Sequence, residues 1–216
     1  MPVPTNAHVF MTAPATWRAD ATMTLVTAPR RDRPTERTGL KEQSWRAAGT
    51  ERFELTPLSP LLPSTTYELR SSRGEILGVF TTSVIEDKHP PTWGGLRSGR
   101  LWKERRGPGV IVPPECGTEL VLLEGPSQAV DDQTQSVDIR YALWAARAGA
   151  PIDYGSPPLT WTTRDRDLPT RFTLQYGSSS PEDMDFELPK DRPLRVGVKA
   201  YDLAANATDA SEVTLE

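Results

Sequence analysis

The strongest indication of the fold is the stretch LRVGVKAY, residues 194–201, near the end of the chain. Its apolar and polar side chains alternate. Because successive side chains of a strand point to opposite faces, one face should pack on a core and the other should meet water. A polar turn over residues 202–209 follows, and Val213 and Leu215 mark a second short strand. The stretch therefore predicts a closing antiparallel hairpin and an all-β protein.

Shorter runs of the same kind recur along the chain and predict further strands. They cover residues 7–12, 22–27, 52–55, 67–70, 76–82, 110–112, 119–124, 137–144, 159–163 and 171–176. The chain holds 21 prolines among 216 residues, about twice the average usage of roughly 5%. Since proline is excluded from helix interiors and central strands, this composition favours many short strands. The charged residues 29–42 are expected to form a loop with one edge strand, and the basic residues 97–109 an exposed loop.

The first part of the chain carries a family resemblance. It shows LxPxxPLxPxTxYxL over residues 55–69, followed by GxFTT over residues 78–82. This combination resembles bacterial Ig-like domains of the SbsA type. The resemblance covers residues 3–84, with residues 28–50 departing from the pattern. It implies an Ig-like β-sandwich that serves as a spacer or binding module and brings no catalytic residues.

The second part resembles another repeat of surface proteins. The run VKAYDLAANAT, residues 198–208, is similar to the end of bacterial fibronectin-type-III or Ig-like repeats, with Ala205 where glycine is usual. The run DKHPP, residues 87–91, is similar to the join between such repeats. We therefore expect an all-β chain of two tandem Ig-like or fibronectin-III-like β-sandwich domains. The first spans residues 1–86, a proline-rich linker spans 87–92, and a larger second sandwich with loop insertions spans 93–216.

Residues suited to catalysis are scarce. A Ser–His–Asp triad needs a histidine beside a nucleophile, yet His8 lies in the first predicted strand and His89 in the linker. A nucleophilic Cys116 would need a neighbouring cation, and a small half-buried residue at a strand entrance is the simpler interpretation. One cysteine and two distant histidines cannot supply a tetrahedral zinc site. We therefore predict no enzymatic activity, although a hydrolase with an unfamiliar carboxylate site stays an alternative.

Calcium is the one metal worth considering, because it prefers oxygen ligands. Three acidic loops offer them: Asp131-Asp132, residues 182–185 and residues 202–209. None follows an EF-hand spacing, and loop carboxylates are usually solvated. The prediction is therefore no cofactor, with bound Ca²⁺ kept as an alternative.

Five residues are candidates for contact with a ligand or partner: Trp102, Trp144, Trp161, Arg105 and Arg106. Strand parity places Trp144 opposite Tyr141 and Leu143, on the face assigned to solvent, unless residues 97–112 or the other domain cover it. The basic loop could contact an acidic partner or anionic polymer, or simply be solvated.

Together these patterns predict a non-enzymatic tandem module that acts as spacer, adhesin or protein-binding subunit, with a protein or cell-surface polymer as partner. The alternative is a carbohydrate-binding module that uses exposed tryptophans. A net charge of −4 and no basic face argue against nucleic acid, and no apolar run is long enough for a transmembrane helix. We expect an extracellular, periplasmic or outer-surface location, with any signal or lipoprotein anchor upstream of Met1. A single cysteine also fits a cytoplasmic protein, so that location stays open.

Overall fold

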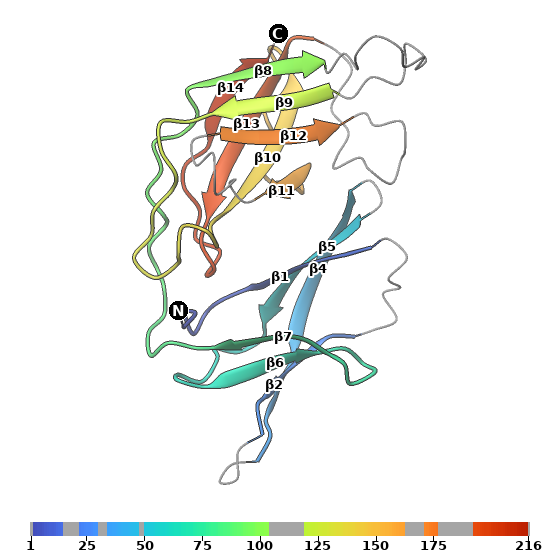
Figure 1. Ribbon diagram of the computed structural model, residues 1–216, viewed down its shortest axis with the longest axis vertical. Coiled ribbons are helices and arrows are strands. Elements are labelled where there is room, and N and C mark those ends of the chain that lie inside the picture. The colour runs from blue at the N-terminus through green and yellow to red at the C-terminus, as the bar shows by residue number, and fades with distance from the viewer. Residues whose placement is uncertain are drawn as a thin grey trace, which may run out of the picture.

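The computed structural model describes residues 2–14, 22–29, 34–47, 50–103, 119–162, 171–176 and 192–215. Within these residues the chain forms antiparallel sheets and no helix (Figure 1). The strands are β1 (Val9–Pro14), β2 (Thr24–Thr27), β3 (Arg37–Thr38), β4 (Leu40–Ala47), β5 (Thr50–Pro57), β6 (Thr66–Arg70), β7 (Ile76–Thr81), β8 (Ser98–Lys103), β9 (Glu119–Glu124), β10 (Arg140–Arg147), β11 (Thr160–Thr162), β12 (Arg171–Tyr176), β13 (Leu194–Tyr201) and β14 (Ser211–Leu215). The all-β class predicted from the alternating runs is confirmed.

Strands β1 to β7 form one pair of layers. One sheet has the order β1-β5-β4 and the other has the order β3-β2-β6-β7. Phe53 and Leu55 of β5 share a buried cluster with Leu25 of β2 and with Tyr67 and Leu69 of β6. Because residues of both sheets enclose this one core, the layers form a β-sandwich, which we call the first sandwich.

Strands β8 to β14 form a second pair of layers, the second sandwich. Its sheets have the orders β12-β9-β8 and β11-β10-β13-β14. Leu123 of β9 meets Tyr141 and Leu143 of β10 and Val196 and Val198 of β13 in a separate buried cluster. Figure 1 shows the two sandwiches stacked along the long axis of the molecule, with the N-terminal segment between them.

Two expectations about loops are wrong. The residues read as an exposed basic loop contain β8, which pairs with β9 along its whole length, and Leu101 packs on the core. Within residues 29–42, the expected single edge strand is replaced by β3 and the start of the eight-residue β4. A Cβ atom at Gly99 would collide with Leu215 and Val213, so β8 carries a glycine where the core-facing position would otherwise hold an apolar side chain. The predicted strand at 110–112 lies outside the described residues.

The closing hairpin forms as expected, with a turn that reaches toward the first sandwich. Strands β13 and β14 pair antiparallel, and Ala205 adopts a positive φ of 63°. The Asp202 Oδ1 accepts a hydrogen bond of 2.9 Å from the backbone N–H of Asn206. Alanine thus occupies the left-handed position that glycine usually fills in such turns. Leu203 and Asn206 of this turn contact His8 and Asp87, at the junction between the two sandwiches.

Candidate functional site

Polar contacts join the two sandwiches at a junction. The backbone N–H of His8, in the first sandwich, donates to the carbonyl of Leu203 at 2.7 Å. The Leu203 N–H in turn donates to Thr134 Oγ1 at 3.2 Å, and the Gln133 side chain donates to the carbonyl of Glu86 at 3.3 Å. The N-terminal segment, the linker and two loops of the second sandwich therefore meet at one place.

Asp87 lies at the centre of this junction. The Asn6 side chain donates to the Asp87 carbonyl at 2.7 Å, and its Oδ1 accepts a bond of 2.9 Å from the Asp87 N–H. The Asn206 amide donates to the same carbonyl at 3.2 Å. Asp87 has no exposed surface. One linker residue is thereby joined to the first sandwich and to the closing hairpin of the second.

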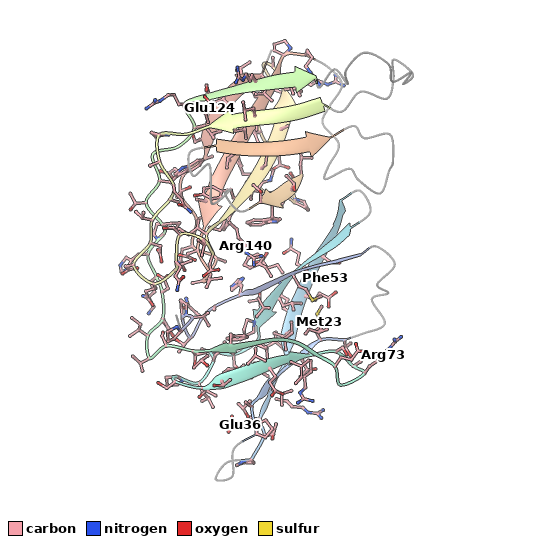
Figure 2. The ribbon with its side chains drawn as sticks, in the orientation of Figure 1. Met23, Glu36, Phe53, Arg73, Glu124 and Arg140 are labelled. Atoms are coloured by element: carbon pink, nitrogen blue, oxygen red, sulfur yellow. The ribbon has the colours of Figure 1, made fainter. Side chains whose placement is uncertain are left out.

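An aromatic contact accompanies the polar one. The Phe10 ring lies 4.1 Å from the guanidinium carbon of Arg140 and 5.6 Å from the ring of Trp161. The Trp161 ring makes an edge contact of 4.8 Å with Tyr201. Figure 2 shows Arg140 between the two sandwiches. Residues of β10 and β11 therefore contact one side chain of β1, and Tyr201 of β13 packs on Trp161.

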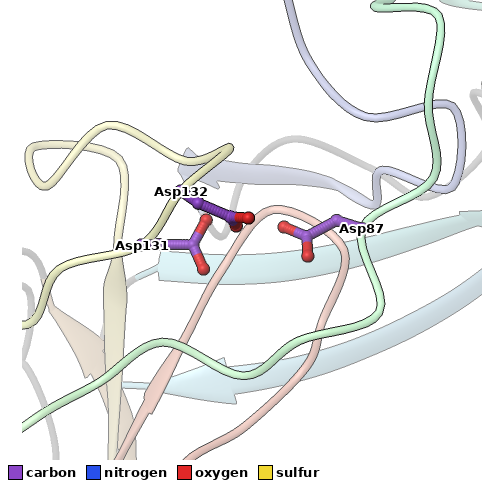
Figure 3. Close-up of side chains that lie close together, drawn as sticks. All are labelled: Asp87, Asp131 and Asp132. Atoms are coloured by element: carbon purple, nitrogen blue, oxygen red, sulfur yellow. The ribbon is translucent and has the colours of Figure 1, made fainter.

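Three carboxylates gather beside the polar contacts. Asp87 of the linker and Asp131 and Asp132 of the loop before β10 place carboxylate oxygens within 4.8 Å of one another. Figure 3 shows the Asp87 carboxylate pointing toward the other two. We call these residues the acidic cluster. An open hollow of about 350 Å³ adjoins it, lined by His89, Pro90, Thr92, Val130, Asp131 and Asp132.

Hydrogen bonds fix two members of the acidic cluster. Asp131 Oδ1 accepts from the N–H groups of Gln133 at 2.9 Å and Thr134 at 2.6 Å. Asp87 Oδ1 accepts from the His89 N–H at 3.2 Å. The other Asp87 oxygen, Oδ2, is buried and has no hydrogen-bond partner among the described residues.

The charges of the acidic cluster are mutually unfavourable. Burial raises the pKa of Asp87, the His89 N–H opposes that shift, and the charges of Asp131 and Asp132 add to it. Burial also raises the pKa of the nearby Asp202 to about 6, against the hydrogen bonds from Asn206, and the charges of Asp87 and Asp131 raise it further. Within the described residues, no lysine or arginine forms an ion pair with a member of the cluster.

The predicted contact residues do not form a common surface in the described chain. Trp144 is 5% exposed, donates its Nε1–H to the Ser156 carbonyl at 2.9 Å, and makes an edge contact of 5.2 Å with Tyr154. Trp144 is therefore covered and not exposed, and Tyr154 and Ser156 are described residues that contact its ring. Strand parity identifies the face of a side chain but not what lies over it.

The other contact candidates fall at different places. Trp161 is half-buried against Phe10 and Tyr201 in the junction. Trp102 belongs to β8, and its side chain lies outside the described residues, as do Arg105, Arg106 and Cys116.

Sequence reasoning found part of the acidic cluster and missed its centre. The sequence marks Asp131-Asp132 as an oxygen-rich loop, whereas it places Asp87 only in the linker. The run DKHPP, residues 87–91, is the one sequence signal for Asp87. It resembles the segment that joins two repeats, and residues of such a segment lie next to both domains. The acidic residues 182–185 lie outside the described residues.

No protein-family model and no curated protein matches the chain. Among solved structures, it aligns with a pullulanase from Anoxybacillus sp. LM18-11 at a TM-score of 0.27 and 9% identity, covering 92% of this chain and 23% of that one. A type I pullulanase from Bacillus subtilis gives a TM-score of 0.26 and 8% identity, covering 95% and 23%. A marsupial T cell receptor gives a TM-score of 0.23 and 11% identity, covering 97% and 91%.

The chain thus spans about a quarter of the length of the pullulanases it matches. At these TM-scores the alignments carry no argument about activity. The described residues include no helix that could cross a membrane. The comparisons assign the chain to no family.

Proposed function

We propose that this chain is a non-enzymatic tandem Ig-like module that acts as spacer, adhesin or protein-binding subunit of a secreted or surface protein. The observation that carries the proposal is the junction. Asp87 bonds to Asn6 on one side and to Asn206 on the other, while Phe10 packs on Arg140 and Trp161. Such specific contacts favour one relative orientation of the two sandwiches, which a rigid spacer or an extended binding surface requires.

Strand order supports the Ig-like part of the proposal. In chain order, the second sandwich pairs its first, second and fifth strands in one sheet and its third, fourth, sixth and seventh in the other. This resembles the A-B-E and C-F-G distribution of seven-stranded Ig-like sandwiches, with the fourth strand on the C-F-G sheet. In the first sandwich the hydroxyl of Tyr67 accepts a bond of 2.9 Å from the Leu62 N–H, five residues upstream. That contact is similar to the tyrosine corner of Ig-like domains.

The surroundings of the two histidines support a non-enzymatic role. His8 Nδ1 lies 2.7 Å from Glu54 Oε1, and its ring stacks on Phe10, so it belongs to the packing of the junction. His89 is exposed in the linker. The carbohydrate-binding alternative loses support, because Trp144 is covered and Trp161 packs inside the junction.

Small-angle X-ray scattering of the full chain tests the proposal. A rigid module gives one scattering profile that matches the stacked arrangement of Figure 1. The variant Asn6→Ala removes both hydrogen bonds to Asp87 and should broaden the distribution of distances. Val79→Ala, at an exposed position of β7, is the matched control and should leave the profile unchanged. A wild-type profile that requires two independently moving bodies would overturn the proposal.

A further inference from the structure

The carboxylates of the acidic cluster come from two separate parts of the chain. Asp87 belongs to the linker, whereas Asp131 and Asp132 belong to the loop before β10. Their oxygens lie within 4.8 Å of one another. Ca²⁺ binds oxygen at about 2.3–2.6 Å, so two ligands on opposite sides of one ion are about 5 Å apart. The spacing therefore suits a shared calcium ion.

Asp87 Oδ2 provides independent support. This oxygen is buried and has no hydrogen-bond partner in the described chain, and the carboxylate that carries it points toward Asp131 and Asp132 (Figure 3). Buried carboxylate oxygens normally have a donor or a cation beside them, because an unpaired buried charge is costly. The nearest other charged groups of the cluster are Asp131 and Asp132, which are also anionic. A cation between the three would satisfy all of them.

The surroundings of the cluster favour binding. Asp87 is held through its main chain by Asn6 and Asn206, and Asp131 is held through Oδ1 by two N–H groups. Lys88 does not compete, since its ammonium lies 2.9 Å from Glu86. Calcium takes six to eight oxygens. Three carboxylates supply part of that number, and the adjoining open hollow leaves room for water to supply the rest.

We propose that Asp87, Asp131 and Asp132 bind one calcium ion, which fastens the linker to the second sandwich. The ion would join a residue already bonded to Asn6 to a loop already bonded to Leu203 through Thr134. Binding would therefore tighten the same junction that holds the two sandwiches. The site does not depend on the proposed function, because it concerns only the chemistry of the cluster.

Calorimetric titration of the calcium-stripped full chain with CaCl₂ tests the site. We expect saturable binding of one ion with a dissociation constant of about 10⁻⁴ to 10⁻³ M, as for extracellular modules, and a midpoint of thermal unfolding that rises with Ca²⁺ concentration. Mg²⁺ should bind more weakly, because it demands a compact octahedral site and gives up water reluctantly.

Asp132→Asn is the decisive variant. Asp132 is exposed and makes no hydrogen bond within the described chain, so the variant should fold normally and lose at least tenfold in Ca²⁺ affinity. Asp131→Asn keeps the oxygen that accepts from Gln133 and Thr134, and it should lose affinity in the same way. Asp209→Asn is the matched control, because Asp209 is exposed and outside the cluster; its affinity should equal that of the wild type.

Three results would overturn the site. They are no saturable binding by the wild type up to about 10 mM Ca²⁺, full affinity in both Asp132→Asn and Asp131→Asn, or a tenfold loss in Asp209→Asn. Tighter binding of Mg²⁺ than of Ca²⁺ would overturn the choice of ion. Scattering with and without Ca²⁺ separates this test from the proposed function. A rigid chain that binds no Ca²⁺ contradicts only the site, whereas a chain that binds Ca²⁺ and stays flexible with the ion bound contradicts only the rigid module.

Discussion

The guanidinium carbon of Arg140 lies 4.1 Å from the ring centroid of Phe10, so a cation of the second sandwich rests on an aromatic face of the first. Burial lowers the pKa of Arg140 to about 10, although the charges of Asp138 and Glu54 oppose the shift. Arg140 is therefore still charged at neutral pH. A partly desolvated cation on an aromatic ring contributes roughly 1–2 kcal/mol.

A double-mutant cycle measures this contact. Phe10→Leu keeps an apolar side chain without the ring, and Arg140→Met keeps the length without the charge. We expect a coupling free energy of about 0.5–2 kcal/mol between the two positions in urea unfolding. Additive effects, with coupling below about 0.3 kcal/mol, would show that the stacking contributes nothing.

Ala205→Gly should stabilise the protein. Ala205 has a φ of 63°, where a Cβ atom costs roughly 1 kcal/mol and glycine has no such cost. We expect a gain of about 0.5–1 kcal/mol in the free energy of unfolding. Ala207→Gly is the control. Its φ is not positive, so the added freedom of the unfolded chain should lower stability by about 0.5–1 kcal/mol. A loss of stability in Ala205→Gly would contradict the turn geometry.

Asp202 should make stability fall as the pH rises through the mildly acidic range. Its pKa is about 6 in the folded chain, against a model-peptide value of 3.8. Between these values the folded state keeps a proton that the unfolded state has released. The proton on Asp202 therefore contributes fully to the free energy of unfolding below pH 3.8, and this contribution is lost above pH 6. It amounts to roughly 3 kcal/mol at about 1.4 kcal/mol per pKa unit.

The variant Asp202→Asn isolates this effect, because asparagine does not titrate. Urea unfolding from pH 4 to pH 7 in the presence of a chelator should show a steeper fall in stability for the wild type than for the variant. The variant also changes hydrogen bonding with Asn206, so the comparison uses the slope against pH and not the absolute stability. Parallel curves would rule out the raised pKa.

Tyr67→Phe should weaken the first sandwich. The Tyr67 side chain is buried, and its hydroxyl accepts the Leu62 N–H at 2.9 Å. Removing the hydroxyl should cost about 1–2 kcal/mol, since the N–H loses its acceptor. Tyr154→Phe is the matched control, because the Tyr154 hydroxyl donates to Glu212 in an exposed position. Its cost should stay below about 0.5 kcal/mol. Equal losses in the free energy of unfolding for the two variants would show that the hydrogen bond from Leu62 to Tyr67 adds no particular stability.

Sequence patterns predict the strands that are rich in apolar residues. Residues 119–124, 171–176 and 194–201 were expected as strands, and β9, β12 and β13 have these bounds. The pattern failed for β8, where Gly99 faces the core at a point that leaves no room for a side chain. It also failed for β4, an edge strand in which Glu42 and Ser44 are exposed. Period-two alternation is thus lost wherever close packing or an edge position removes the apolar residue.

The candidate site was harder to foresee than the fold. Asp131 and Asp132 are adjacent in sequence, so their oxygens could be recognised as a pair. Asp87 is far from them in sequence and is held in place by hydrogen bonds from Asn6 and Asn206, and no local pattern predicts such a tertiary contact. The burial of Trp144 under Tyr154 is similarly a product of tertiary packing.

The bonds from Asn6 and Asn206 to a single carbonyl have a mechanical consequence. A force that pulls the two sandwiches apart along the long axis acts on the linker, and the Asp87 carbonyl lies between the two amides that grip it. The linker can therefore lengthen only after the hydrogen bonds from Asn6 and Asn206 to the Asp87 carbonyl have broken. Tensile load on Asp87 is therefore shared among three segments of the polypeptide: the linker, the N-terminal segment and the closing hairpin.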